Sequence, residues 1–490
     1  MTAAELREKE IDKVDPLKAA EKGDPNRLTD RETPGTANTA NPYASDVAQP
    51  APVSGPQLST STSGGDSDYN GPSVLSRSYT LSRPMSSEQI NWKLSFGLTY
   101  AWDRGQLSGI IGPGGNYETS DNQSRAVNWG LNGRHVWKHD QLGVNYTGNY
   151  SNYTLDALSG ANNSLNLDYQ HAFSSHFTFQ LVESLQALSQ NYSVENPALA
   201  SGTSVASLSS STSPNMQLTG NTVRQTNTTL STTYHQTNRL SYDLSASYFV
   251  IGRTGIGYVG TLGKQASADV NYRLTSRMTV GAFYSYTNYQ FSHNISTSDS
   301  HTTGGIFSYA LSKRTQLRTR IGGTRIETLG YQTVILPPAL AQILGEASSI
   351  VNAYNLRWTT DASAELVRDF GRSRTASIAY RHGQSPGNGI LLTSVQQTVS
   401  AGYSTRLMRR LPVSVGYDYS TLQTLSQNNL GVYSNQTWYF STTRQISRSV
   451  SSTVRFDYRR YDISDSPLLQ HDLRISFTLT WSPPENTVRF

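Results

Sequence analysis

The sequence feature that most constrains the fold is an alternation of apolar and polar side chains that begins at Trp92. Up to Asp103, every second residue is aromatic or leucine, and the residues between them are polar or small. Successive side chains of a β-strand point to opposite faces of the sheet, so this period of two predicts a strand with one apolar face. The same pattern returns in 142–146, 165–169, 177–181, 242–248, 266–272, 413–419, 454–458 and 473–481. We therefore predict an all-β fold for this part of the chain.

Two kinds of connection alternate between the predicted strands. Short polar turns cover 138–140, 174–175, 237–239, 275–277, 312–314, 371–373, 408–410 and 447–449. Longer loops, rich in Gly, Ser, Asn and Pro, cover about 104–122, 154–163, 190–220, 252–261, 290–301, 326–352, 383–388, 422–430 and 462–469. This regular alternation of short and long connections is typical of an antiparallel up-and-down barrel of about eighteen strands. The chain then enters its first strand and leaves its last strand on the short-turn side. The alternation is interrupted in 124–137, 225–235 and 433–446, and an error of one hairpin would give roughly sixteen or twenty strands.

Composition places this barrel in a membrane. Hydrophobic residues make up 36% of the chain and charged residues 15%, both low for a soluble globular protein. No stretch reaches the roughly eighteen consecutive apolar residues of a transmembrane helix. Only helices and closed barrels satisfy every backbone group in lipid, so we predict a transmembrane β-barrel. A soluble sandwich also has alternating strands, but here most strands have one apolar face and, at about ten residues, match a tilted membrane strand.

Aromatic residues gather towards the strand ends, as expected for girdles at the two membrane–water interfaces. Those predicted for the girdles are Trp92, Trp102, Tyr419, Tyr458 and Trp481. Over about residues 88–482 the chain resembles the bacterial outer-membrane β-barrel proteins, a porin-like class, without the features of one particular family. Its last strand, 472–481, is similar to the C-terminal signal read by the barrel-assembly machinery. The resemblance implies a Gram-negative outer membrane, with its lipid and this machinery as partners.

The two ends of the chain differ from the predicted barrel. Residues 1–87 are rich in Pro, Ala, Ser, Thr and Gly and bury too little apolar area to order, so we predict a disordered polar tail. The barrel topology places both termini in the periplasm. Residues 1–20 lack the apolar core of a secretory signal, which is expected of a mature chain or a misassigned start codon. Pro483 and Pro484 cannot continue a ladder, so the last strand is expected to end at Trp481, with 483–490 as a short extension.

A barrel of about eighteen strands has room for an aqueous lumen, so we expect an outer-membrane channel or exporter for hydrophilic solutes or polymers. The alternation points these charged residues of the second half inward: Arg318, Arg320, Arg357, Asp361, Glu365, Arg381, Arg406, Asp418, Arg455, Asp457, Arg459 and Arg474. One reading is an electropositive lining that favours anionic solutes or an acidic polysaccharide. The other is a set of Arg–carboxylate pairs that brace the wall and leave little net field. Asp168, Asp243 and Asp269 in the first half favour this second reading.

Two long loops are candidates for narrowing the pore. The loop 326–352 contains two prolines followed by leucines at helical spacing, typical of a short amphipathic helix. Its candidate constriction residues are Leu336, Pro337, Leu340, Ile343 and Leu344. This helix would either fold into the lumen or lie outside as a lid or contact surface. The Ser- and Ala-rich loop 190–220 is the second candidate, and its other reading is a mobile surface loop.

Other functions find little support among the residues. The nine histidines are scattered outside any recognisable catalytic motif, so no enzyme activity is expected. The chain has no Cys, no metal-ligand spacing and no Gly-rich phosphate loop, so no cofactor is expected. The net charge of +5 is spread along the chain, which indicates no nucleic-acid partner. The rival to a channel is a structural or scaffold barrel that holds a periplasmic or lumenal partner through residues 1–87.

Overall fold

In the computed structural model the described residues are 89–111, 117–154, 159–188, 222–254, 259–335, 348–371, 374–387, 392–408, 411–425, 432–463, 470–483 and 486–489. They contain nineteen β-strands and one short 3-10 helix, η3 (Ser292–Asn294). The strands are β1 (Gln89–Ile111), β2 (Tyr117–Val136), β3 (Asp140–Tyr153), β4 (Gly160–Ala172), β5 (Phe177–Leu188), β6 (Thr222–His235), β7 (Leu240–Thr254), β8 (Thr261–Arg273), β9 (Met278–Phe291), β10 (Ser296–Ser312), β11 (Thr315–Ile335), β12 (Ser348–Asp369), β13 (Thr375–Gly387), β14 (Leu392–Met408), β15 (Leu411–Thr424), β16 (Tyr433–Gln445), β17 (Val450–Ile463), β18 (Gln470–Trp481) and β19 (Asn486–Arg489). Within these ranges no helix is long and apolar enough to cross a bilayer. The predicted all-β fold is confirmed.

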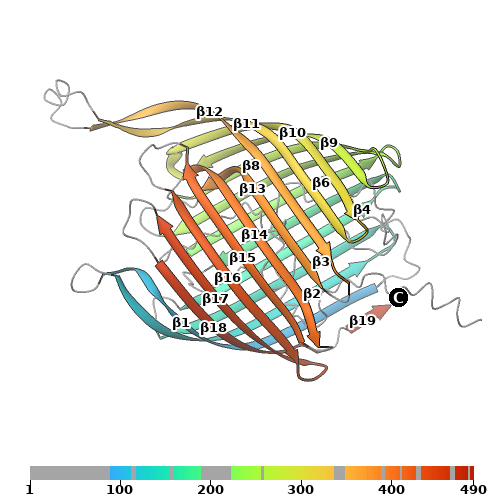
Figure 1. Ribbon diagram of the computed structural model, residues 1–490, viewed down its shortest axis with the longest axis vertical. Helices are drawn as coiled ribbons and strands as arrows, with labels where there is room; N and C mark the ends of the chain where they lie inside the picture. Colours follow the sequence, from blue (N-terminus) through green and yellow to red (C-terminus); the bar gives the residue numbers. More distant parts are fainter. Residues whose placement is uncertain are drawn as a thin grey trace, which may run out of the picture.

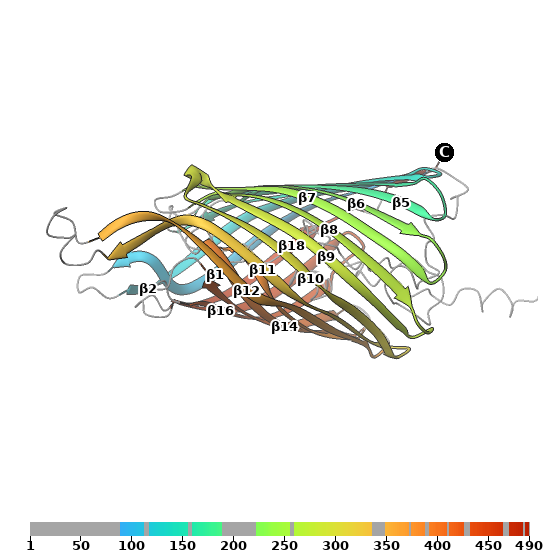
Figure 2. The same ribbon diagram turned by 90° about the horizontal axis from the view of Figure 1, so that it is seen from above.

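Strands β1 to β18 close into one antiparallel barrel. Each strand pairs with the next along the chain, and β1 also pairs with β18, from Phe96–Trp481 to Gly105–Asp472. Figures 1 and 2 show the strands running obliquely around one continuous wall. The predicted up-and-down barrel of about eighteen strands is thus confirmed. The three stretches with interrupted alternation are strands as well, namely β2, β6 and β16.

The two faces of the wall differ as the alternation predicts. On β1, Trp92, Phe96 and Tyr100 are about half exposed on the outside, while Ser95 and Asp103 are buried on the inside. The ladder uses the backbone hydrogen-bonding groups, so the apolar outer side chains can face hydrocarbon. The aromatic residues predicted for the girdles all lie on this outward face: Trp92, Trp102, Tyr419, Tyr458 and Trp481.

Several connections predicted as long loops are much shorter, because the strands continue beyond their apolar stretch. β1 runs to Ile111 and β2 begins at Tyr117, so most of the predicted loop 104–122 is strand. Likewise, β10 begins at Ser296, with one residue between it and the end of η3 at Asn294. Beyond the apolar band a strand needs only its backbone hydrogen bonds, so polar residues on both faces no longer mark it in the sequence. The β1–β2 and β11–β12 hairpins consequently project from the same end of the barrel (Figures 1 and 2).

The chain remains attached to the barrel after its last long strand. β18 ends at Trp481, and the Ser482 hydroxyl donates a hydrogen bond to the Leu94 carbonyl (3.1 Å). β19 then pairs with Gln89–Trp92 at the start of β1. The proline that follows Ser482 interrupts the ladder because it has no N–H to donate. The predicted extension therefore contains a short strand that resumes pairing along β1.

Candidate functional site: the lumen and its mouth

The inner face of the barrel is polar and charged, which makes the lumen the candidate functional site. The predicted lining residues lie on the strand face opposite to the exposed aromatic side chains. Seven of them are buried: Arg318, Glu365, Asp418, Arg455, Asp457, Arg459 and Arg474. Four are partly exposed: Arg320, Asp361, Arg381 and Arg406. Arg357 is exposed, in the part of β12 whose ladder partner among the described residues is β11 alone.

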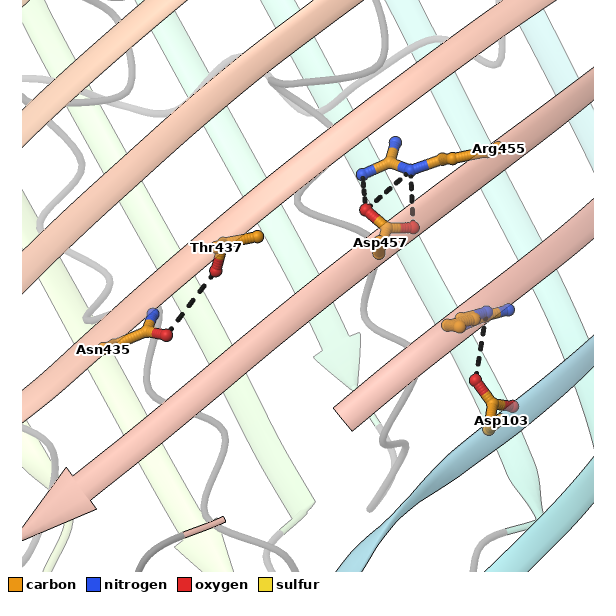
Figure 3. A network of polar contacts seen from close by, with 6 residues as sticks. Asp103, Asn435, Thr437, Arg455 and Asp457 are labelled. Carbon is orange, nitrogen blue, oxygen red and sulfur yellow. Dashed lines mark hydrogen bonds and ion pairs between the residues drawn. The ribbon is translucent and has the colours of Figure 1, made fainter. Parts of the chain in front are cut away.

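The densest group of charges lies at the seam where the barrel closes. The guanidinium of Arg455 on β17 donates to both carboxylate oxygens of Asp457, with distances from 2.8 to 3.0 Å (Figure 3). These two side chains are 5% and 1% exposed. Asp457 is in register with Arg474 on β18, and the Arg474 Nε lies 3.5 Å from a carboxylate oxygen of Asp103 on β1. Positive and negative groups therefore alternate from β17 to β1 across the seam.

A second group of charges surrounds Arg320 on β11. The Arg320 guanidinium lies 3.7 Å from the carboxylate of Asp269 on β8 and 3.8 Å from that of Asp361 on β12. Its Cζ is 3.5 Å from the ring centre of Phe283 on β9, a cation–π arrangement. β8 and β12 are separated by three strands in the sheet. This one side chain therefore connects strands that share no backbone hydrogen bonds.

The pairing defines what these arginines do on the wall. A charge removed from water is costly unless an opposite charge and hydrogen bonds match it. Arg318 follows the same rule, with its Nη1 3.7 Å from a carboxylate oxygen of Glu365. For Arg318, Arg320, Arg455 and Arg474, the geometry is that of the second reading, Arg–carboxylate pairs that brace the wall. Their contribution to a net positive field in the lumen is correspondingly small.

The inner wall offers a passing solute hydroxyl, amide, guanidinium and carboxylate groups. Such groups bind and orient polar molecules through hydrogen bonds and charge. Across the described ranges, no three His, Cys, Asp or Glu side chains stand together as metal ligands would. The chemistry that the described lumen supports is therefore polar recognition.

At the long-loop mouth, the wall opens between β12 and β13. Their ladder runs from Asp369–Thr375 to Ala362–His382 and stops there. β13 nevertheless stays paired with β14 as far as Gly387. The prediction of a loop over 383–388 is therefore wrong for 383–387, which is strand. The Gly- and Pro-containing sequence loosens the ladder with β12, while the hydrogen bonds to β14 keep the segment extended.

The segment beyond this opening is turned into the lumen. In a single-layer wall, inward and outward side chains alternate along each strand. Here the successive residues 385–387 of β13 are all buried, and so are the successive residues 393–394 of β14. Protein therefore covers both faces of the segment, as it would inside the barrel. We call residues 383–387 and 392–395 together the inner flap.

Contacts across the lumen show where the inner flap lies. Leu392 packs against a buried apolar cluster on the inner wall, which we call the lumen cluster. It consists of Phe249 and Ile251 of β7 with Tyr289 and Phe291 of β9. Along the wall, six strands lie between β7 and β14. Side chains of these two strands can meet only through the interior of the barrel.

Two hydrogen bonds support the same position. The side-chain amide of Gln384, in the flap, donates to the Ser298 hydroxyl of β10 (3.2 Å). Behind the flap, the Asn355 side-chain amide of β12 donates to the Leu425 carbonyl beyond β15 (3.5 Å). β12 thus meets the end of β15 at the mouth, although β13 and β14 lie between these strands in the sheet. At the mouth, the contact between β12 and the end of β15 therefore bridges the gap in the wall, and the flap lies on the inner side of this contact.

Sequence reasoning missed the inner flap, although weak signals were present. Pro386 lacks an N–H for the β12 ladder, and Gly387 has a φ of +80°, which favours glycine. Phe249 and Ile251 are apolar at positions that the alternation points inward, an indication of a buried contact. The loop 190–220 lies outside the described residues. So do the predicted constriction residues Leu336, Pro337, Leu340, Ile343 and Leu344.

Comparison with known proteins adds little beyond the architecture. No family model matches the sequence, and no curated protein matches it. Among solved structures, OpdQ of Pseudomonas aeruginosa is 12% identical with a TM-score of 0.39, over 81% of this chain and 98% of that chain. The outer membrane protein OpdK of the same organism is 9% identical with a TM-score of 0.41, over 80% and 99%. OccAB3 of Acinetobacter baumannii is 10% identical with a TM-score of 0.38, over 80% and 99%. At these values the likeness assigns neither substrate nor mechanism to this chain.

The chain's own geometry defines its class. A closed antiparallel barrel with an exposed apolar outer face and a polar, charged inner face is built to stand in a bilayer. This is a porin-like transmembrane β-barrel. The inner flap and the paired charges at the seam are the main features of its described lumen.

Proposed function

We propose that this protein is a channel that passes small hydrophilic solutes across the bacterial outer membrane. The observation that carries the proposal is the polar, charged inner face of a closed barrel of this width. Partly exposed charged groups on this face, such as Arg320 and Arg406, can form hydrogen bonds with water and polar solutes in the lumen. We further propose that the short turns and both chain termini face the periplasm.

A modest preference for anions is the finer part of the proposal. On the inner face of β11 to β18, arginines outnumber carboxylates among the described residues. The ion pairs compensate much of this charge, so selectivity between small ions should be slight rather than strict. Arg406, partly exposed on the inner face of β14, is placed to act on a passing anion.

The test is electrical recording from the purified protein in planar bilayers. We expect discrete conductance steps and, across a KCl gradient, a reversal potential that shows anion preference. Arg406→Gln should shift the reversal potential towards cations, whereas Arg460→Gln, on the outward face of β17, should leave it unchanged. A barrel that inserts but stays silent, and that co-purifies with a partner bound to residues 1–87, would instead favour the scaffold.

A further inference from the structure

We propose that the inner flap is the gate of this channel, which shuts the mouth when it lies on the lumen cluster and opens it by withdrawing. The inference rests on the proposed channel function and adds to it the moving part. The flap spans the interior from β14 towards β7 and β9, where Leu392 meets the lumen cluster. It therefore lies across the path that a solute takes at the long-loop mouth.

The mouth has the apolar character of a gate. Phe249 and Phe291 of the lumen cluster are nearly inaccessible, and so are two apolar side chains on the opposite wall, Leu422 and Tyr433. Elsewhere on the inner face, buried residues are mostly polar or charged. A narrow apolar constriction excludes water and ions, and this is how hydrophobic gates shut aqueous pores. Withdrawal of Leu392 would let water reach the polar surface beyond it.

The flap is held in a way that allows release. Its contacts with other parts of the inner wall include the packing of Leu392 against the lumen cluster and the hydrogen bond from Gln384 to Ser298 of β10. Thr393, directly after Leu392, has a φ of +40°, which is unfavourable for a β-branched residue. The closed position therefore carries backbone strain that movement of the flap would relieve.

A second position for the flap exists on β12. If the β12–β13 register continued beyond Ala362–His382, Gly383 would lie opposite Asp361 and Gly387 opposite Arg357. Gly383 already stands beside Asp361, whose Oδ1 would be 2.7 Å from a Cβ placed on that glycine. The flap can thus pair with β12 in the wall or lie in the lumen, but not both. Pro386 would leave one rung of that ladder without a hydrogen bond, which weakens the position on β12 relative to an uninterrupted ladder.

The ring of His382 marks the branch point between the two positions. Its Nδ1 lies 2.9 Å from the carbonyl oxygen of Thr360, which is two residues beyond the last ladder pair on β12. The ring thereby occupies a carbonyl that the extended ladder would otherwise use. Opening requires this contact to break as well, so the structure contains a defined point from which the flap would swing.

A reversible cross-link tests the movement. The chain has no Cys, so Ser298→Cys with Gln384→Cys introduces a unique pair that a short bis-methanethiosulfonate can join. We expect K⁺ and Cl⁻ current through the double variant to fall about tenfold or more after cross-linking and to return after reduction. The current through each of the two single-cysteine variants should not change when they are treated with the same reagent. Current that is unaffected by a cross-link verified by mass would overturn the gate.

A substitution tests the hold on the closed position without any reagent. Leu392→Ala removes most of the contact with the lumen cluster, and we expect the open fraction to rise about tenfold. Leu407→Ala is the matched control, because Leu407 lies on the same strand and is exposed on the outside. Equal conduction in the wild type and both variants would overturn the gate and leave the channel standing. Silence of every variant, cross-linked or not, would remove the channel function and the gate with it.

Discussion

Asp457 stands among three guanidinium groups on the inner wall. It accepts hydrogen bonds from Arg455, is in register with Arg474, and is followed two residues later on the same face by Arg459. All four side chains are buried. Breaking a buried ion pair by removing one partner leaves an uncompensated charge that water cannot solvate, which costs more than the intact pair contributes. The seam is therefore sensitive to the loss of one charge.

At this scale we predict that Asp457→Asn lowers the free energy of unfolding by about 3–5 kcal/mol. The amide keeps the shape of the side chain but removes the negative charge that the arginines need. Equilibrium unfolding in urea, from lipid vesicles, measures the change. Asp462→Asn, on the outward face of the same strand, should change it by at most about 1 kcal/mol. Similar losses in the two variants would show that the seam charges do not stabilise the barrel.

At the scale of elements, β18 and β19 both pair with β1, at different positions along it. β18 pairs with β1 along ten residue pairs, from Phe96–Trp481 to Gly105–Asp472. β19 pairs with β1 along four, at Gln89–Trp92. The longer ladder forms the seam, and the shorter one covers the edge of β1 that would otherwise be open at the short-turn end.

We predict that a chain ending at Pro483 still assembles in the outer membrane, because the β1–β18 seam and the aromatic end at Trp481 remain. Its free energy of unfolding should fall by about 2–4 kcal/mol, since a few net hydrogen bonds to Gln89–Trp92 are lost. The folded fraction in outer-membrane preparations and urea unfolding measure these two effects. A truncated chain that fails to assemble would place the assembly signal in residues 486–490 instead.

The whole molecule has two unlike ends. At one end the strands are joined by tight turns, such as the one between β4 and β5. At the other end hairpins such as β11–β12 project from the barrel (Figures 1 and 2). The inner flap belongs to the end with the hairpins, as do η3 and the lumen cluster. In the proposed orientation, the gate would therefore face the exterior of the cell and control entry.

This orientation predicts which end is accessible from outside. In intact cells, a membrane-impermeant maleimide should label His293→Cys, in exposed η3, and spare Ser175→Cys, in an exposed short turn. Both variants should be labelled to the same extent after the cells are broken, because the chain contains no other Cys. Labelling of Ser175→Cys alone in intact cells would reverse the proposed orientation.

Much of the fold could be predicted from local sequence. The period of two from Trp92 onward predicts the strands and separates outward from inward side chains, because a strand's geometry alternates its side chains whatever its neighbours. The exchange of short turns with long loops predicts the strand number, because each tight turn joins two adjacent strands. Strand ends were predicted less well. Polar residues on both faces hide the start of β10, and Gly and polar residues interrupt the alternation where β1 continues past Asp103.

Only the tertiary structure decided the site. The contact of Arg474 with Asp103 joins the last and first strands of the barrel, β18 and β1, and that of Leu392 with the lumen cluster crosses the interior. Such partners share no local pattern, so the alternation assigned the charges to the inner face but could not pair them. The same composition that predicted a loop at 383–388 also suits a strand that leaves the wall. Whether this segment pairs with β12 in the wall or lies in the lumen depends on contacts that exist only in the closed barrel, and no stretch of sequence contains them.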